Sequence, residues 1–275
     1  MTHIDIHTHL NIAAFNDDRD EVIARTRAGG VGMINVGTQL DTSRTALELT
    51  KKHIEGVYAT VGLHPVHTSK SYHDTQELGE EGKAFTSRGE VFDIDVYRTL
   101  AADEKVVAIG ECGLDYYRAE ETTKQKQVEA FLAQIALANE LNKPLMLHIR
   151  DKGDGRAYYD ALSILKKDAR VRGNVHFFAG SIAVAKEFLE LGYTLSFTGV
   201  ITFAKEYEEL VSYVPLDMMH AETDAPYVAP VPYRGTRNEP LFVKETANKI
   251  AEIKKEELGV VLEQLRANAK ELFGV

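Results

Sequence analysis

The stretch MTHIDIHTHL, residues 1–10, decides both the fold and the chemistry that we predict for this chain. Isoleucines alternate with polar residues, which is the pattern of a half-buried strand. Side chains two residues apart in a strand share a face, so His7 and His9 project to the same side, about 7 Å apart along the backbone. Two neutral imidazoles that converge on one point suit a divalent transition metal. The alternative is a polar strand face that carries its histidines by chance.

Seven further apolar runs follow, and amphipathic stretches separate them. The runs expected to form strands cover residues 31–36, 57–63, 106–109, 145–149, 175–178, 194–197 and 218–222. The stretches expected to form helices cover residues 17–28, 42–53, 124–141, 158–166, 182–191 and 204–213, and the chain from 241 onward. Eight units in 275 residues, about 34 residues each, predict an α/β fold of the (β/α)8 TIM barrel type. An open doubly wound sheet is the alternative, but no Gly-x-Gly-x-x-Gly follows the first strand.

We interpret residues 1–275 as a single domain, because no low-complexity or Pro/Gly/Ser-rich linker divides the chain. The third unit is irregular, since a polar segment of about residues 66–91 separates His64 from the next strand. This segment is longer than an ordinary loop between a strand and a helix, so we expect an insertion at the rim of the active site. It is either a surface excursion or a lid over the substrate.

The composition argues against several classes of protein. The chain is 44% hydrophobic, yet it has no run of about 18 apolar residues that would span a membrane. Its start lacks the basic-then-apolar layout of a signal peptide, and its single cysteine, Cys112, allows no internal disulfide. We therefore expect a cytoplasmic protein, with a monomer favoured. A net charge of −10 argues against a basic face that coats nucleic acid, but not against local handling of phosphate.

Further residues of the metal-ligand type stand at the ends of the later apolar runs. In a (β/α)8 barrel the carboxyl ends of the strands form one face, and active sites are built there. Six of these side chains offer more nitrogen and oxygen ligands than one tetrahedral ion accepts, so a site for two divalent ions is favoured. The predicted metal ligands are His7, His9, Glu111, His148, His176 and Asp224.

We expect Glu111 to bridge the two ions, because its strand lies between the strands of the other ligands. Nitrogen and oxygen ligands suit zinc, manganese or iron and, less well, magnesium. Asp224 would orient the attacking water or accept its proton, which makes Glu111 and Asp224 the expected catalytic residues.

Three more residues are expected to bind the substrate. Arg150 and Arg237 flank the predicted centre, and a guanidinium binds phosphate through two hydrogen bonds; a surface salt bridge is the alternative for each. His64 contacts either a phosphate or a water at the metals, or it is a structural turn residue before Pro65.

With these residues in view, the chain resembles the TatD family of metal-dependent deoxyribonucleases, a branch of the amidohydrolase barrels. The matching motifs are DIHTH (5–9), GLHP (62–65), GECGLDYY (110–117), LHIR (147–150), HFFAG (176–180), ETDAPY (222–227) and RNEP (237–240). The resemblance runs the whole length and implies the barrel fold, a metal-dependent phosphodiesterase chemistry and the ligand set above. It also implies how the ligands divide: Glu111 bridges, His7, His9 and Asp224 bind one ion, and His148 and His176 bind the other.

Two departures from the family pattern concern the substrate. The motif after the sixth strand usually reads His-Cys-Phe-Ser/Thr-Gly, whereas this chain has Phe177 and Ala179. The missing hydroxyl at position 179 removes one possible contact to substrate. The insertion in the third unit is also longer than is typical of the family.

The leading hypothesis is therefore a metal-dependent hydrolase of nucleic-acid phosphodiesters, a 3′–5′ exodeoxyribonuclease acting on single-stranded DNA ends. One alternative is a metal-dependent ester or amide hydrolase, such as a D-aminoacyl-tRNA deacylase, which the acidic composition mildly favours. The other is a metal-binding accessory protein without turnover, but such a protein has no use for phosphate-binding arginines.

Overall fold

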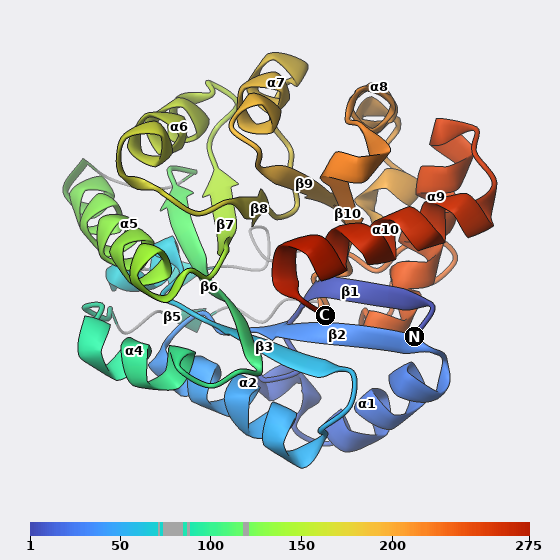
Figure 1. Cartoon of the computed structure of the whole chain (residues 1–275), viewed down its shortest axis with the longest axis horizontal. Coiled ribbons are helices and arrows are strands. Elements are labelled where there is room, and N and C mark those ends of the chain that lie inside the picture. The colour runs from blue at the N-terminus through green and yellow to red at the C-terminus, as the bar shows by residue number, and fades with distance from the viewer. Residues whose placement is uncertain (71, 74–84, 87–88, 118–120) are drawn as a thin grey trace.

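In the computed structural model, which describes residues 1–70, 72–73, 85–86, 89–117 and 121–275, eight parallel strands form one sheet in the order β1-β2-β3-β6-β7-β8-β9-β10. The strands are β1 (His3–Thr8), β2 (Val31–Val36), β3 (Val57–Val61), β6 (Val106–Asp115), β7 (Leu145–Arg150), β8 (Gly173–Val175), β9 (Thr194–Phe197) and β10 (Met219–Ala221). The sheet curls round so that its first and last strands meet, and helices cover its outside (Figure 1). The predicted (β/α)8 barrel is confirmed.

The helices fall close to the ranges expected from the sequence. They are α1 (Arg19–Ala28), α2 (Leu40–Lys52), α4 (Ile94–Ala101), α5 (Glu121–Leu141), α6 (Arg156–Asp168), α7 (Ile182–Glu190), α8 (Glu208–Tyr213), α9 (Val243–Lys254) and α10 (Leu258–Phe273). Two differences stand out. No helix was expected at α4, which Asp93 caps by accepting from two backbone N–H groups of its first turn. The helix expected over 204–213 divides into a 3₁₀ turn, Lys205–Tyr207, and the short α8.

The segment after β10 closes the barrel against β1. Thr8 pairs with Ala225 in a parallel bridge, and the His9 N–H donates to the Ala225 carbonyl over 2.8 Å. The Asp224 N–H donates to the His7 carbonyl over 2.9 Å. Closure of the barrel therefore places the carboxylate of Asp224 beside the two histidines of the first strand.

Strand β6 is longer than predicted, because it continues from Ile109 through the polar stretch to Asp115. Two glycines allow this, since they let β6 pass close to the backbone of β7. A Cβ at Gly110 would lie 2.4 Å from the Met146 carbonyl oxygen, and one at Gly113 would lie 2.1 Å from that of His148. Glu111 and Asp115 consequently stand on one continuous strand, four positions apart and therefore on the same face.

Apolar side chains fill part of the barrel interior below its carboxyl end. Ile4 and Ile6 of β1 pack in one cluster with Ile34, Ala108 and Met146. Helix α10 joins this cluster through Ala269 and Phe273, and it runs along β1 in Figure 1. The C-terminal helix thus covers one end of the barrel and leaves the other end for the site.

The predicted insertion at 66–91 is only partly described. Pro65–Thr68 forms a 3₁₀ turn, and β4 (Tyr72–His73) pairs antiparallel with β5 (Phe85–Thr86). Residues 71, 74–84 and 87–88 lie outside the described chain, so the choice between surface excursion and lid stays open, as does the single-domain prediction. Among the described residues, no helix is both long and apolar enough to cross a membrane.

Candidate metal centre

Seven side chains from six places in the barrel converge at the carboxyl ends of the strands. They are the six predicted metal ligands and one predicted substrate-binding residue: His7, His9, Glu111, His148, His176, Asp224 and His64. Each belongs to at least one group of three whose ligand atoms all lie within 4.8 Å of one another. The positions of these residues in the sequence range from 7 to 224, so only the barrel topology brings them together.

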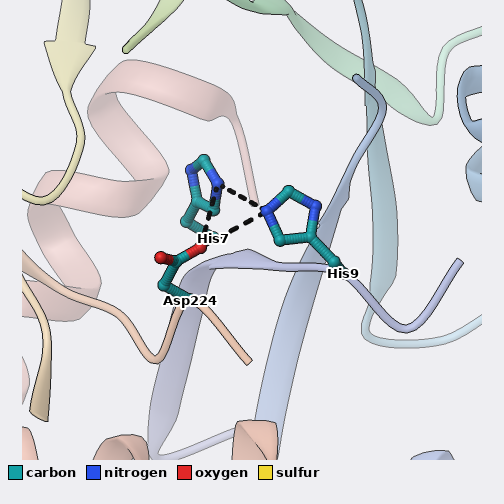
Figure 2. A group of neighbouring side chains, drawn as sticks. All are labelled: His7, His9 and Asp224. Atoms are coloured by element: carbon teal, nitrogen blue, oxygen red, sulfur yellow. Dashed lines mark hydrogen bonds and ion pairs between the residues drawn. The ribbon is translucent and has the colours of Figure 1, made fainter. Parts of the chain in front are cut away.

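We call His7, His9 and Asp224 the first half-site. The Nε2 atoms of His7 and His9 are 3.2 Å apart, and Asp224 Oδ1 lies 3.7 Å from the first and 3.3 Å from the second. Figure 2 shows these three atoms facing one another, with the second carboxylate oxygen outside the triangle that they form. Strand alternation places both imidazoles on one face, as predicted, and the loop after β10 supplies the carboxylate.

We call His64, His148 and His176 the second half-site, and Glu111 joins it to the first. Glu111 Oε1 lies 2.9 Å from His176 Nε2, 3.0 Å from His148 Nδ1 and 3.3 Å from His64 Nε2. Its other oxygen, Oε2, lies 3.5 Å from His7 Nε2 and 3.8 Å from His9 Nε2. Each half-site therefore faces its own oxygen of Glu111, which is the arrangement that a bridging carboxylate needs.

The outer nitrogens of two imidazoles, His9 and His148, hydrogen-bond to acceptors behind them, whereas that of His176 faces a carboxylate at ion-pair distance without a hydrogen bond in the described chain. His9 Nδ1 lies 3.0 Å from the Val36 carbonyl, and His148 Nε2 lies 2.9 Å from Asp115 Oδ2. His176 Nδ1 lies 3.5 Å from Glu222 Oε1. Such acceptors keep the proton on the outer nitrogen, so that the inner nitrogen offers its lone pair to a metal.

Two of these acceptors, Asp115 and Glu222, were missed by the sequence analysis. Strand periodicity contained the signal, because Asp115 lies four residues after Glu111 and Glu222 lies two before Asp224. Asp115 was missed because the predicted strand ended at residue 109. Asp5, by contrast, acts on the backbone rather than on a ligand imidazole. It accepts from the backbone N–H groups of His7 (3.3 Å) and Thr223 (2.9 Å), and so ties β1 to the loop after β10.

Burial and mutual attraction set the charges of the centre. Burial alone would raise the pKa of Glu111, but the surrounding imidazoles, His64 foremost, hold that pKa well below its ordinary value. Burial would likewise raise the pKa of Asp224, and its hydrogen bond with His9 brings that pKa below the ordinary value instead. Burial lowers the pKa of His64 to about 4 and also lowers that of His7. Burial would also lower the pKa of His9, His148 and His176, but the neighbouring carboxylates raise it above the ordinary value instead. Imidazoles bind metal in the neutral form, so metal binding at these three would release protons.

The donor set fits divalent ions of the borderline or hard type. It contains imidazole nitrogens and carboxylate oxygens and no thiolate, because the Sγ of Cys112 points instead toward the carbonyls of Ile109 and Met146. The close approach of His7 Nε2 to His9 Nε2, both buried, is natural for two lone pairs that share a cation. His7, His9 and Glu111 are at most 6% exposed, so an ion held there would be shielded from bulk water.

The two predicted phosphate-binding arginines lie in different settings. Arg150 ends β7, two residues after His148, and its guanidinium carbon lies 4.1 Å from the ring centroid of Tyr117. Arg237 instead donates to both carboxylate oxygens of Asp18, over 2.9 and 2.6 Å, and covers the ring of Phe15. Its pairing is the salt bridge that the sequence left open as the alternative, so binding phosphate would require Arg237 to exchange this partner.

Comparison with known proteins places this site in a family. Residues 4–274 match the family described as "TatD related DNase". The chain is 38% identical over 276 residues to a Bacillus subtilis (strain 168) protein named "Uncharacterized metal-dependent hydrolase YabD", covering 98% of both chains. It is 36% identical over 281 residues to "3'-5' ssDNA/RNA exonuclease TatD" of Klebsiella pneumoniae (strain 342), covering 98% of this chain and 97% of that one.

Solved structures share the barrel. The TatD homologue YJJV of Escherichia coli K12 superposes with a TM-score of 0.81 at 24% identity, over 100% of this chain and 98% of that one. A hydrolase of the TatD family from Entamoeba histolytica superposes with a TM-score of 0.80 at 23% identity, over 98% and 97% of the two chains. At these identities the likeness confirms the fold.

Proposed function

The chain belongs to the TatD-related DNase family, and from that premise we propose that it removes nucleotides from single-stranded nucleic-acid ends in the 3′–5′ direction. It is a metal-dependent hydrolase that acts on ester bonds. The observation that carries the proposal is the position of Glu111, whose two oxygens face two separate groups of imidazoles. A shared carboxylate between two ions is the arrangement found in enzymes that cleave phosphodiesters.

The ligands that we assign follow the two half-sites. His7, His9 and Asp224 would hold one ion, His148 and His176 would hold the other, and Glu111 would serve both; zinc, manganese and magnesium are the candidates. The bound ions supply a nucleophile from water at neutral pH and neutralise charge on the phosphate oxygens. Every other part of the proposed reaction is carried out by side chains of the protein.

Asp224 is placed to handle the proton. Its Oδ1 faces His7 and His9, which leaves its other oxygen to orient the attacking water and accept its proton (Figure 2). His64 packs against the ring of His148 with the centroids 4.1 Å apart, and burial keeps it uncharged near neutral pH. Its Nδ1 accepts from the Val66 N–H over 3.2 Å, which is the turn role before Pro65 that the sequence left as the alternative. Its Nε2, which faces Glu111, is therefore the ring nitrogen that we assign to a phosphate oxygen.

Arg150 is the cation that we assign to a phosphate of the substrate strand. It shares the inward face of β7 with His148 and lies two residues nearer the barrel mouth, where a flanking phosphate would lie. Tyr117 stacks on its guanidinium and fixes the plane of the fork. We assign Arg237 a structural part, because Asp18 already occupies both of its terminal nitrogens.

The metal centre lies below the barrel mouth, and this burial favours the ends of nucleic-acid strands as substrate. The Glu111 side chain is 3% exposed and that of Asp224 is 13% exposed, so the interior of a duplex cannot bring its backbone to them. A terminal nucleotide of a single strand can leave its stack and enter the mouth.

A direct test uses single-stranded DNA of about 20 nucleotides with a label at its 5′ end. We expect a ladder that shortens from the 3′ end, disappears with chelator and returns with manganese, zinc or magnesium. A 3′-phosphorothioate block should stop the ladder, and Glu111→Gln serves as the inactive control. If no cation gives a ladder while an aminoacyl ester of tRNA is hydrolysed, the substrate is the ester rather than the strand.

A further inference from the structure

A column of buried polar side chains runs through the barrel interior beneath the second half-site. It begins at Glu222, whose Oε2 accepts from the hydroxyl of Ser196 over 2.7 Å. Ser196 Oγ also lies 2.9 Å from Asn174 Oδ1, and Asn174 Nδ2 lies 3.1 Å from Thr194 Oγ1. The column ends at His220, whose Nε2 lies 3.1 Å from the same Thr194 oxygen.

The column lies in the barrel interior, whose opposite side is lined by apolar side chains. Thr194 is 8% exposed and the other four members at most 1%, so water does not satisfy their polar atoms. Across the barrel, β1 and β2 present Ile4, Ile6 and Ile34. A chain of five polar side chains in such surroundings is costly unless each donor meets an acceptor.

The number of available hydrogens decides which group donates and which accepts in each hydrogen bond of the column. The hydroxyl of Ser196 has one hydrogen, but Asn174 Oδ1 and Glu222 Oε2 are both acceptors only. A half-turn of the Asn174 amide removes the conflict, because its nitrogen then donates to Ser196 while Ser196 donates to Glu222. Asn174 Oδ1 then faces Thr194, whose hydroxyl donates to it in place of the Gly173 carbonyl at 3.4 Å.

His220 completes the order at the far end. Burial lowers its pKa to about 3, so it carries a single N–H at neutral pH. In the order given above, Thr194 has already used its hydrogen and can only accept from His220. The N–H of His220 therefore lies on Nε2, and Nδ1, which meets no partner within the described chain, is the bare nitrogen.

Glu222 receives the donors of the column at one oxygen and a backbone donor at the other. The Phe177 N–H donates to Oε1 over 2.6 Å, with Phe177 itself at φ +43°, a region that residues other than glycine rarely adopt. His176 Nδ1 lies 3.5 Å from the same oxygen, within ion-pair distance but without a hydrogen bond to any described residue. Both oxygens of Glu222 are thus fixed before any contact with His176 is counted.

We propose that Ser196, Asn174, Thr194 and His220 form a polarised hydrogen-bond column whose donors all point toward Glu222, and that the column positions Glu222 to orient His176 for metal binding. These four are positioning residues, because they reach the metal centre only through Glu222 and His176. The proposal rests on His176 being a metal ligand, as assigned in the proposed function, but it does not require that the substrate be nucleic acid.

The first test measures metal affinity rather than turnover. Ser196→Ala removes the donor to Glu222, and Ser43→Ala is the matched control, since Ser43 is equally buried on α2 and outside the column. We expect Ser196→Ala to weaken one of two cobalt or zinc sites by about 10–100-fold, the range for outer partners of metal ligands, and to alter the cobalt absorption spectrum. Ser43→Ala should leave both unchanged. Equal affinities in Ser196→Ala and wild type, whatever the change in melting temperature, would overturn the proposal.

The second test moves one step down the column. Thr194→Val keeps the shape and removes the hydroxyl, Thr194→Ser restores it, and Thr50→Val is a control for a buried threonine on α2 that bonds the Leu47 carbonyl. We expect Thr194→Val to weaken the same metal site by a smaller factor than Ser196→Ala, with recovery in Thr194→Ser. A loss in Thr194→Ser as large as that in Thr194→Val would show that packing rather than the hydroxyl matters.

The third test reads the order of the column directly. Long-range ¹⁵N–¹H NMR of histidine-labelled protein distinguishes the two neutral forms of His220, with His220→Gln giving the assignment. We expect the proton on Nε2 in the wild type. A proton on Nδ1 would contradict the order and the proposal with it. None of the three tests uses nucleic acid, so failure of the nuclease assignment would leave their outcome intact.

Discussion

The two half-sites acquire negative charge in different ways. In the first, Asp224 is itself a ligand-type group, 3.3 Å from His9 Nε2, while His9 rests on an uncharged carbonyl and His7 Nδ1 has no partner within the described chain. In the second, Glu111 is the one carboxylate of the described residues that faces the centre. Further negative charge stands behind the imidazoles, as Asp115 behind His148 and Glu222 behind His176.

This difference divides the work between the half-sites. A carboxylate at the centre can take part in proton transfer, whereas one behind an imidazole acts only through the ring that it orients. We therefore expect the first half-site to carry the chemistry and the second to hold its ion and the substrate. Glu111 belongs to both, and damage to it should have the largest effect.

Glu111→Gln should abolish turnover while the fold persists. Gln keeps the volume but loses the negative charge with which two oxygens can bridge two ions, so we expect kcat to fall by more than about 10⁴-fold, beyond the loss expected at either half-site alone. Circular dichroism would establish the fold, and Glu90→Gln, whose carboxylate accepts from Tyr97 instead, is the control. Wild-type turnover of Glu111→Gln at saturating metal would contradict the role of Glu111 as a bridging ligand.

The variants Asp224→Asn and Asp115→Asn compare the first half-site with the second. For Asp224→Asn we expect kcat to fall by about 10²–10⁴-fold, the usual cost of losing a proton-transfer group. For Asp115→Asn we expect a loss of about 10–100-fold that excess metal largely restores, because the change acts through His148. The comparison needs kcat measured across a metal titration for both variants. Full rescue of Asp224→Asn by metal would make the two half-sites equivalent.

The arginines near the two half-sites sharpen the same contrast. Arg150→Ala should raise KM for an oligonucleotide about tenfold and spare a small activated phosphodiester, since a charge-assisted contact contributes about 1.5 kcal/mol. Arg237→Ala should act on stability, because it breaks the pair with Asp18. Thermal melts beside both assays would separate the effects. A large KM effect in Arg237→Ala without a change in melting temperature would restore it as a phosphate ligand.

The last prediction concerns the pH dependence of stability and the contribution that His220 makes to it beneath the second half-site. Burial lowers the pKa of His220 from 6.5 to about 3, so the unfolded chain binds its proton more readily than the folded one. The contribution to stability is complete above pH 6.5 and is lost as pH falls from there toward 3. At pH 5 the free energy of unfolding lost through His220 is about 2 kcal/mol. Urea titrations of wild type and His220→Gln should show a shallower fall between pH 7 and 5 in the variant; parallel curves would exclude this source.

The sequence predicted the barrel, and it singled out six side chains that the structure brings together, because both depend on local pattern. His-x-His alternation, and acidic or histidine residues at strand ends, are visible in one pass along the chain. Asp115 and Glu222 were missed because their importance depends on which imidazole lies across the barrel. Arg237 illustrates the same limit. Arg237 follows the last strand, but its partner Asp18 lies far away in the sequence, in the loop after β1. Closure of the barrel brings these two segments together.

The central claim is that one carboxylate bridges two ions, and anomalous diffraction from crystals loaded with zinc tests it most directly. The account predicts two peaks, one among His7, His9 and Asp224 and one beside His148 and His176. Each should lie about 2.0–2.2 Å from a different oxygen of Glu111. A single peak, or two peaks of which only one contacts Glu111, would contradict the account.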